Sequence, residues 1–270
     1  LGDVYKRQLH FNQVINQIRD LPALPAIVHD LMKNISPDET DIHVITRKVS
    51  MDQALSAKTL QFANSSFYGL QSKVTTIQQA ITLIGVNAVR HVVTATALTA
   101  YFPPNNCAGF DFFALWRHSV ATAVCARVLA RHLHVNQDYA FTAGLLHDIG
   151  RLVLVTYFRS EYEAVIAYRN EHDCHWLIAE REVLGVDHVM AGDALAAHWN
   201  FSETIRHAIA GHHNPEQQTV RSLASIVHVA DAIAHALDLS HLENDLVPPI
   251  SHVAWVGLDL SADVYQQVFH

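Results

Sequence analysis

The sequence has few cysteines, few charged residues and no excess of basic side chains. Cys107, Cys125 and Cys174 are scattered and show no C-x-x-C spacing. We therefore expect neither a disulfide framework nor a structural zinc site, and a reducing, cytoplasmic compartment fits best. Only 16% of the 270 residues are charged and 50% are hydrophobic, which excludes disorder as the overall state. With 18 Lys and Arg against 26 Asp and Glu, the net charge of −8 argues against binding nucleic acid or an anionic membrane.

The sequence also lacks a long uncharged hydrophobic run. The best candidate, residues 139–158, contains Asp148 and Arg151. Each charge costs roughly 2.5–3.5 kcal/mol near a bilayer centre, whereas each Leu, Ile, Val or Phe returns only about 0.3–0.6 kcal/mol. The free-energy cost of inserting the two charges exceeds the gain from the apolar residues, so we expect a buried helix of a soluble protein.

The first residues resemble a remnant of a sequencing adapter. DVYKRQ, residues 3–8, resembles the translated end of a transposon adapter used in sequencing libraries, and position 1 is Leu. We therefore leave residues 1–8 out of the fold prediction and expect the natural chain to extend upstream.

Strand-like alternation is almost absent, and apolar residues recur instead at the i, i+3, i+4, i+7 spacing of helices. This pattern predicts an all-α, two-lobed fold. The Pro-, Asn- and Gly-rich segment 101–110 predicts the boundary between lobes at 9–100 and 111–238, with a tail at 239–270. We expect helices at residues 9–18, 23–35, 41–49, 52–64, 76–83, 86–101, 111–133, 138–158, 160–172, 175–184, 188–198, 202–212, 220–238 and 261–269.

The chain contains 20 histidines, and the sharpest pattern among them is His147-Asp148 within GLLHDIG. An ionised Asp in an apolar helix is costly unless it is paired or bound to metal, and an adjacent imidazole and carboxylate suit a divalent metal. Gly144 and Gly150 remove side chains nearby and allow another helix or a ligand to approach. The alternative is a neutral core His147 with Asp148 paired to Arg151, three residues further on. From these residues alone both interpretations stay open.

Two further candidates follow in the same lobe. His212-His213 lies at a helix end, where adjacent side chains diverge; alternatively one is exposed and the other caps the last carbonyl groups. Asp231 falls on the edge of the apolar stripe of helix 220–238, where it is either a ligand or a solvated boundary residue. His228 and His235 lie further from that stripe. The remaining histidines, His175 among them, are expected to be surface or packing residues.

His118 and His188 complete an ordered set, although each of them alone would be interpreted as a core residue. That set resembles the HD superfamily of metal-dependent phosphohydrolases, in which His, His-Asp and a distal Asp bind metal. The extra histidines resemble the HD-GYP branch, where they complete a binuclear or larger site. Mixed imidazole and carboxylate ligands suit iron, manganese or zinc better than calcium, so we expect a mononuclear or binuclear site for one of these metals. In chain order the set is His118, His147, Asp148, His188, His212, His213 and Asp231.

The chain is further similar to a narrower family. LPALPAIVHDLM, FALWRHS, AFTAGLLHDIGRL, HVMAGDALAAHW and HHNP occur in the order typical of the HDOD domain, an HD-related output domain of bacterial signalling proteins. The resemblance covers about residues 14–238. It implies an all-helical fold and a regulatory role, with signalling proteins as partners and often an upstream receiver or sensory domain.

The sequence departs from the HD-GYP phosphodiesterases on the substrate side. It contains no Gly-Tyr-Pro motif, His213 is followed by Asn214 rather than Glu, and Arg151 replaces Lys after HDIG. Arg151 cannot donate a proton at working pH but can hold a phosphate with two hydrogen bonds. We therefore expect a module that binds a partner protein or a small ligand such as a nucleotide, with little or no hydrolysis of cyclic di-GMP. The alternative is a metal-dependent phosphohydrolase acting on a nucleotide or cyclic nucleotide.

Overall fold

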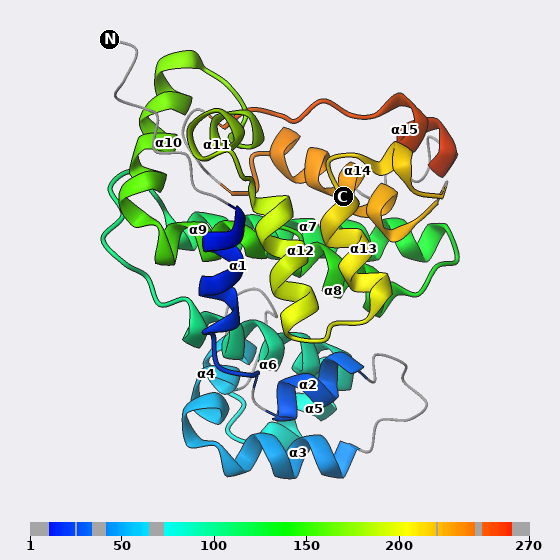
Figure 1. Cartoon of the computed structure of the whole chain (residues 1–270). Coiled ribbons are helices and arrows are strands. Elements are labelled where there is room, and N and C mark those ends of the chain that lie inside the picture. The colour runs from blue at the N-terminus through cyan, green and yellow to red at the C-terminus, as the bar shows by residue number, and fades with distance from the viewer. Residues whose placement is uncertain are drawn as a thin grey trace. The chain divides into compact units, whose positions relative to one another are not determined.

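A computed structural model of the chain describes residues 11–24, 26–33, 42–64, 73–219, 221–240 and 245–260. Every regular element in these ranges is a helix, so the prediction of an all-α fold is confirmed (Figure 1). None of the described helices is both long and apolar enough to cross a bilayer. Residues 1–8 and the helix predicted at 261–269 lie outside the described residues.

Contacts divide the chain into a smaller unit, Ala23–Pro103, and a larger unit made of Leu1–Pro22 and Pro104–His270. In the smaller unit α6 (Val86–Tyr101) contacts α2 (Ala26–Lys33), α4 (Gln53–Ala63) and α5 (Ile77–Ile84). Gly85 alone separates α5 from α6, and its φ of +88° makes the turn that a side chain would strain. The helices of this unit are α2 (Ala26–Lys33), α3 (Ile42–Met51), α4 (Gln53–Ala63), α5 (Ile77–Ile84) and α6 (Val86–Tyr101).

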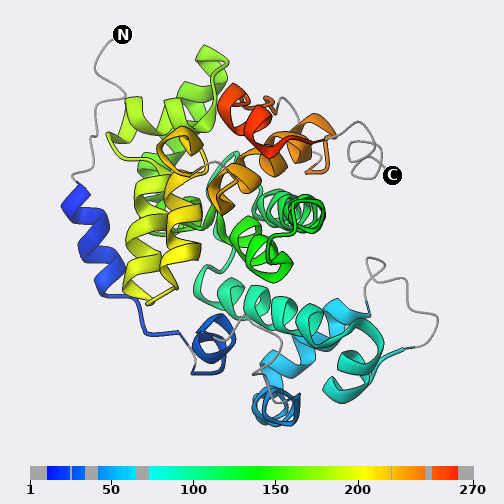
Figure 2. The same cartoon turned by 90° about the vertical axis from the view of Figure 1, so that its right-hand side faces the viewer.

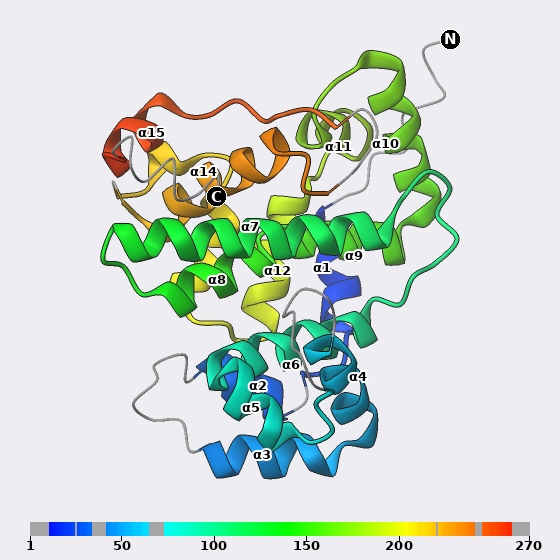
Figure 3. The same cartoon turned by 180° about the vertical axis from the view of Figure 1, so that it is seen from behind.

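The larger unit contains every candidate ligand predicted from the sequence. Its helices are α1 (Phe11–Arg19), α7 (Phe112–His132), α8 (Gln137–Leu146), α9 (Ile149–Tyr157), α10 (Arg159–His172), α11 (Trp176–Leu184), α12 (His188–His198), α13 (Glu203–Gly211), the 3-10 turn η2 (Pro215–Gln217), α14 (Leu223–Ala236) and α15 (His252–Leu258). The long helix α7 runs alongside α8 (Figure 3) and also contacts α14. Helix α12 packs on α9, α13 and α1, and α12 and α13 lie side by side (Figure 2). This packing surrounds the α8–α9 junction with α7, α12, α13 and α14.

Side-chain caps set where the ligand-bearing helices begin. Asp111 accepts a hydrogen bond from the Ala114 amide at the start of α7, and Asp187 accepts one from the Met190 amide at the start of α12. Each cap satisfies a backbone amide that the helix itself cannot pair. The cap at Asp187 makes His188 the first residue of α12. The His188 ring therefore lies at the end of the helix that faces His147 and Asp148, the HD pair.

The predicted continuous helix 138–158 is wrong at its centre. Helix α8 ends at Leu146 and α9 begins at Ile149, so His147 and Asp148 occupy a tight junction between the two helices. The Arg151 amide closes the turn by donating to the Asp148 carbonyl at 2.9 Å. As a result, Arg151 lies in the first turn of α9 rather than in the interior of one continuous helix.

Candidate metal centre

The larger unit brings all the candidate ligands predicted from the sequence to one place, although their metal-binding role stays a prediction. They come from α7, the α8–α9 junction, the first residue of α12, the C-terminal end of α13 and the middle of α14. Three groups of potential ligand atoms result, each with all its atoms within 4.8 Å of one another. The groups are His118, His147 and Asp148; His118, Asp231 and His235; and His188, His212 and His213.

Two glycines of the GLLHDIG segment make this convergence geometrically feasible. A Cβ atom on Gly144 would lie 2.7 Å from Ala123 Cα, so the glycine lets α8 approach the backbone of α7. A Cβ atom on Gly150 would overlap the carbonyl oxygen of His188 and the backbone of Gly192 on α12. The first approach brings His118 to His147, and the second brings His188 to the HD pair.

The Asp148 carboxylate faces His188 and His212 with one oxygen and His147 with the other. Its Oδ1 lies 3.3 Å from His188 Nε2 and 3.8 Å from His212 Nε2. Its Oδ2 lies 3.7 Å from His147 Nε2 and 3.1 Å from Arg151 Nη1. Asp148 therefore contacts imidazoles through both of its carboxylate oxygens, and it also forms the ion pair with Arg151 that the sequence offered as the alternative interpretation.

The spacing between the potential ligand atoms suits a metal ion. His118 Nε2 lies 2.9 Å from Asp231 Oδ1 and 3.3 Å from His147 Nε2. His188 Nε2 lies 3.0 Å from His213 Nε2. Ligand atoms that bind one transition-metal ion at about 2.0–2.2 Å are themselves about 3–3.5 Å apart. The distances therefore match the separation expected of ligands around a shared ion.

Hydrogen bonds fix the proton positions on three of the imidazoles. Nδ1 of His147 donates to the Gly144 carbonyl at 2.7 Å, and Nδ1 of His212 donates to the Ile209 carbonyl at 2.7 Å. Nδ1 of His188 faces Oε2 of Glu180 at 2.6 Å. With the proton on Nδ1, the Nε2 lone pair of each ring points into the cluster, and His212 Nε2 has no hydrogen-bond partner. A buried acceptor without a donor is costly, and coordination of a cation would satisfy it.

Neighbouring charges keep the Asp148 carboxylate ionised, and burial keeps the His212 imidazole neutral. Burial opposes ionisation of Asp148, but Arg151 and the nearby imidazoles hold its pKa well below the usual value. Burial, reinforced by His147 and His188, lowers the pKa of His212 to about 3. Metal ligands must be deprotonated, so these residues are already in the form that binds metal.

Arg151 is buried between acidic groups rather than extended toward solvent. It pairs with Asp148, its Nε lies 3.8 Å from Glu180 Oε1, and its Cζ lies 5.3 Å from the Trp176 ring centroid. The guanidinium nevertheless lines a cavity beside the cluster, so the phosphate-binding role predicted for Arg151 stays a prediction.

Glu180 is an important residue that the sequence did not reveal. Its side chain is fully buried, and it accepts hydrogen bonds from the Tyr162 hydroxyl at 2.9 Å and from the His188 amide at 2.8 Å. Burial lowers the pKa of His188, but Glu180 and then Asp148 offset this and leave it raised. A carboxylate behind a ligating imidazole orients the ring and increases its basicity, which is the position that Glu180 holds behind His188.

Substitution of Glu180 by glutamine tests this positioning role. The amide keeps the size of the side chain but loses the charge that orients His188, so we expect metal affinity to fall roughly 10–100-fold in a folded protein. Isothermal titration with zinc measures the affinity, and circular dichroism checks the fold. Glu182→Gln, an exposed residue on the same helix, is the matched control. Equal affinities for the two variants would contradict the role.

His235 is a second residue that the sequence did not single out. Its Nε2 lies 3.3 Å from Asp231 Oδ1, and its Nδ1 lies 2.7 Å from Oδ2 of Asp245. Burial lowers the pKa of His235, but the two flanking carboxylates outweigh it and raise the pKa to about 10. His228, by contrast, donates from Nδ1 to the His212 carbonyl and accepts at Nε2 from the Ser251 amide. Both nitrogens of His228 are thus used in holding the local structure.

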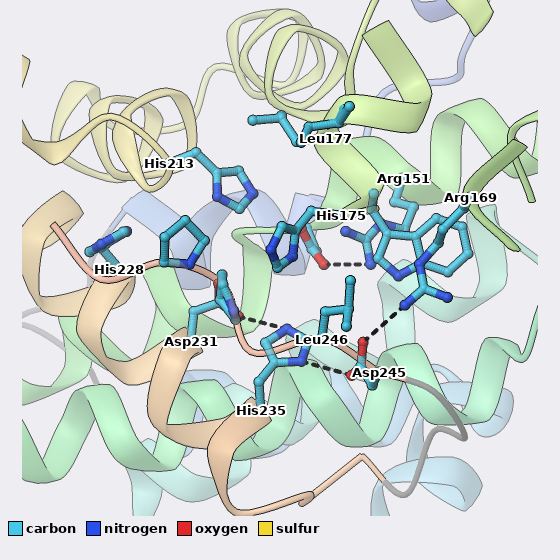
Figure 4. A pocket seen from close by; sticks show the side chains of 15 residues that line it. Arg151, Arg169, His175, Leu177, His213, His228, Asp231, His235, Asp245 and Leu246 are labelled. Carbon is cyan, nitrogen blue, oxygen red and sulfur yellow. Dashed lines mark hydrogen bonds and ion pairs between the residues drawn. The ribbon is translucent and has the colours of Figure 1, made fainter. Parts of the chain in front are cut away.

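A cavity of about 150 Å³ opens beside the cluster (Figure 4). Asp148, Asp231 and His213 contribute to one part of its lining. Two arginines, His175 and Trp176 form a second part, and the segment 245–249 supplies a third. The candidate metal ligands are therefore next to a space that could take a small anionic molecule.

Two solved structures share the fold. One, 23% identical, is an HDOD domain protein of unknown function from Geobacter sulfurreducens; the match covers 92% of this chain and 88% of that one, with a TM-score of 0.78. The other, 26% identical, is a candidate phosphohydrolase from Shewanella amazonensis SB2B; the match covers 95% of this chain and 91% of that one, with a TM-score of 0.72.

Curated relatives are longer than this chain. An uncharacterized protein of Treponema pallidum (strain Nichols) is 24% identical over 83% of this chain and 44% of its own length. Ribonuclease Y of Thermoanaerobacter pseudethanolicus is 35% identical over 44% of this chain and 18% of its own length. This chain thus spans less than half the length of either relative. The family model of the HDOD domain matches residues 21–215, which is most of the sequence, and the chain belongs to the HDOD family of the HD superfamily.

Proposed function

We propose that this HDOD chain binds one or two transition-metal ions in its larger unit and uses them to recognise a phosphorylated small molecule as a regulatory signal. The observation that carries the proposal is the fixed orientation of His147, His188 and His212. Each ring has its Nδ1 paired, so its Nε2, which faces the Asp148 carboxylate, is the atom that a metal ion would bind. Iron, manganese and zinc accept this mixture of imidazole and carboxylate ligands, and calcium suits it less well.

A signalling role is favoured over turnover by the state of Arg151. A hydrolytic site needs a metal ion, a water molecule and a positioned phosphate together, and it often needs a proton donor for the leaving group. Arg151 has no proton to give near neutral pH. Its guanidinium is also held by Asp148 and Glu180. We therefore infer that a phosphorylated ligand is bound and reported to partner proteins, and that cyclic di-GMP is hydrolysed little or not at all.

A metal-dependent phosphohydrolase for a nucleotide or cyclic nucleotide is the second candidate. The cavity is lined by Asp148, Asp231 and His213, so a phosphoryl group could reach metal ions held there. Such ions would activate water and stabilise the charge on the phosphoryl oxygens. The likeness to the candidate phosphohydrolase of Shewanella and to ribonuclease Y supports this alternative.

One set of measurements separates the two candidates. Protein purified without a histidine tag and reconstituted anaerobically is expected to contain iron, manganese or zinc by elemental analysis. Product chromatography with cyclic di-GMP and simple nucleotides then tests turnover in the wild type and in His147→Ala. His207→Ala, an exposed residue on α13, is the control.

Each outcome of these measurements decides something. Metal-dependent binding without turnover, lost in His147→Ala and kept in His207→Ala, supports the signalling role. Turnover that is lost in His147→Ala would establish the phosphohydrolase in its place. Protein that stays metal-free after reconstitution would refute both candidates.

A further inference from the structure

The cavity beside the metal cluster has a cationic side that the ligand predictions do not account for. Arg169 lies there with its side chain 9% exposed, and its Cζ stands 4.5 Å from the Trp176 ring centroid. Arg151 and His175 line the same cavity (Figure 4). Burial lowers the pKa of the Arg169 guanidinium, although Asp245 opposes this. A buried guanidinium stacked on an aromatic ring is rigid and poorly hydrated, which favours recognition of a phosphoryl group.

The carboxylate of Asp245 sits on this cationic side. Its Oδ1 lies 3.7 Å from Arg169 Nη2, and its Oδ2 lies 2.7 Å from His235 Nδ1. The distance to Arg169 exceeds that of a good hydrogen bond, so this particular ion pair is held by charge rather than by a close hydrogen-bonded fit. A phosphoryl group carries the same sign of charge with more oxygen atoms, and it could pair with the guanidinium through two hydrogen bonds.

Asp245 is carried by an extended segment rather than by a helix. The segment from Asp245 to Ile250 has no regular secondary structure, and Leu246, Pro248 and Pro249 line the cavity with Asp245. It is fixed at its far end, where the Ser251 amide donates to His228 Nε2 at 2.8 Å. A carboxylate on such a segment can leave its partners without unfolding a helix.

We propose that Arg169 anchors a second phosphoryl subsite next to the metal centre, and that the Asp245 carboxylate occupies this subsite until a phosphorylated ligand displaces it. The inference rests on the proposed function and deepens it, because it assigns the ligand a phosphoryl group in addition to the one at the metal ions. Displacement of Asp245 would also release His235, whose other nitrogen contacts the candidate ligand Asp231. Occupation of the subsite is thereby coupled to the metal centre.

Phosphate binding to metal-free protein tests the subsite without depending on the metal. We expect Asp245→Ala to bind inorganic phosphate at least about tenfold more tightly than the wild type, since one charge-assisted interaction is no longer contested. Asp245→Asn, which keeps the side-chain volume and an acceptor oxygen for His235, is expected to show the same direction of change. Adding Arg169→Gln to either variant should abolish the gain. Phosphorus NMR titration measures the affinities, and thermal unfolding confirms that each variant is folded.

A matched control separates this subsite from any exposed arginine. Asp193→Ala removes the nearer carboxylate partner of Arg206, which is about one-third exposed and outside the cavity, and leaves only the more distant Glu203. An equal gain in phosphate affinity for Asp193→Ala, or no gain for either Asp245 variant, would overturn the proposal. Metal content is measured separately by elemental analysis, so failure of the subsite and failure of the proposed metal function give different results.

Discussion

Replacing Asp148 with alanine is expected to remove the metal centre as a whole rather than to weaken one ligand. Oδ1 of Asp148 faces His188 and His212, and Oδ2 faces His147. The substitution takes away a carboxylate that contacts His147 through one oxygen and His188 and His212 through the other. We expect metal affinity to fall by more than about 100-fold, the upper value for loss of a group that only supports a ligand. Elemental analysis after anaerobic reconstitution and zinc titration measure the loss.

Arg151 provides the control for this prediction, because the sequence also allowed Asp148 to be merely its ion-pair partner. If Asp148 is a ligand, Asp148→Asn loses metal as Asp148→Ala does, whereas Arg151→Gln keeps it. If the ion pair is the only role, all three variants lose stability and none loses metal. Stability is compared by urea unfolding, because breaking a buried pair costs about 3–5 kcal/mol on either side.

Much of the architecture could be predicted because the local spacing of apolar residues indicates where helices form. The apolar spacing located the helices that carry the candidate ligands, and the resemblance of the order His118, His147-Asp148, Asp231 to the HD superfamily pointed to the residues that converge. The two glycines near the HD pair were expected to permit close approach, and the structure shows which backbone segments they admit. These features depend on short stretches of sequence.

The break in the predicted helix 138–158 at His147 and Asp148 was not predicted, because it depends on tertiary contacts. The apolar pattern of residues 138–158 continues without a break, so periodicity alone predicts one helix. Helix α8 ends just before this pair, where the Asp148 carboxylate contacts His188 of another helix. Local patterns do not contain such long-range interactions.

The supporting residues were missed for similar reasons. Glu180 lies in the charged stretch AEREVL, which is typical of a solvated helix face, and it is packing with α10 and α12 that buries it. His235 had a usable signal, since it follows Asp231 by four residues and therefore shares its side of the helix. Asp245 lies in a segment without regular structure, and no spacing points to its pairing with Arg169 and His235.

Substitution of Gly150 by alanine is expected to disrupt both stability and the His188 half of the centre. The added Cβ would overlap the His188 carbonyl and the backbone of Gly192, and backbone atoms cannot move aside as a side chain can. Helices α9 and α12 would have to separate, which would carry His188 away from Asp148, now 3.3 Å distant. Overpacking of this kind costs about 1–3 kcal/mol or more. Urea unfolding measures the loss of stability, and zinc titration measures the loss of metal affinity.

Gly192→Ala is the matched control, because it adds the same methyl group from the opposite side of the same contact. Its Cβ would meet the Cγ2 atom of Ile209 at 2.9 Å, while Gly150 Cα would lie at an ordinary 3.7 Å. The Ile209 side chain can adjust its rotamer, so we expect a smaller loss of stability and retention of metal. If Gly150→Ala were as stable as the wild type and bound metal equally well, the close approach of α9 and α12 would not be what positions His188. If the two variants lost metal equally, the position of α12 as a whole, rather than the contact at Gly150, would control the site.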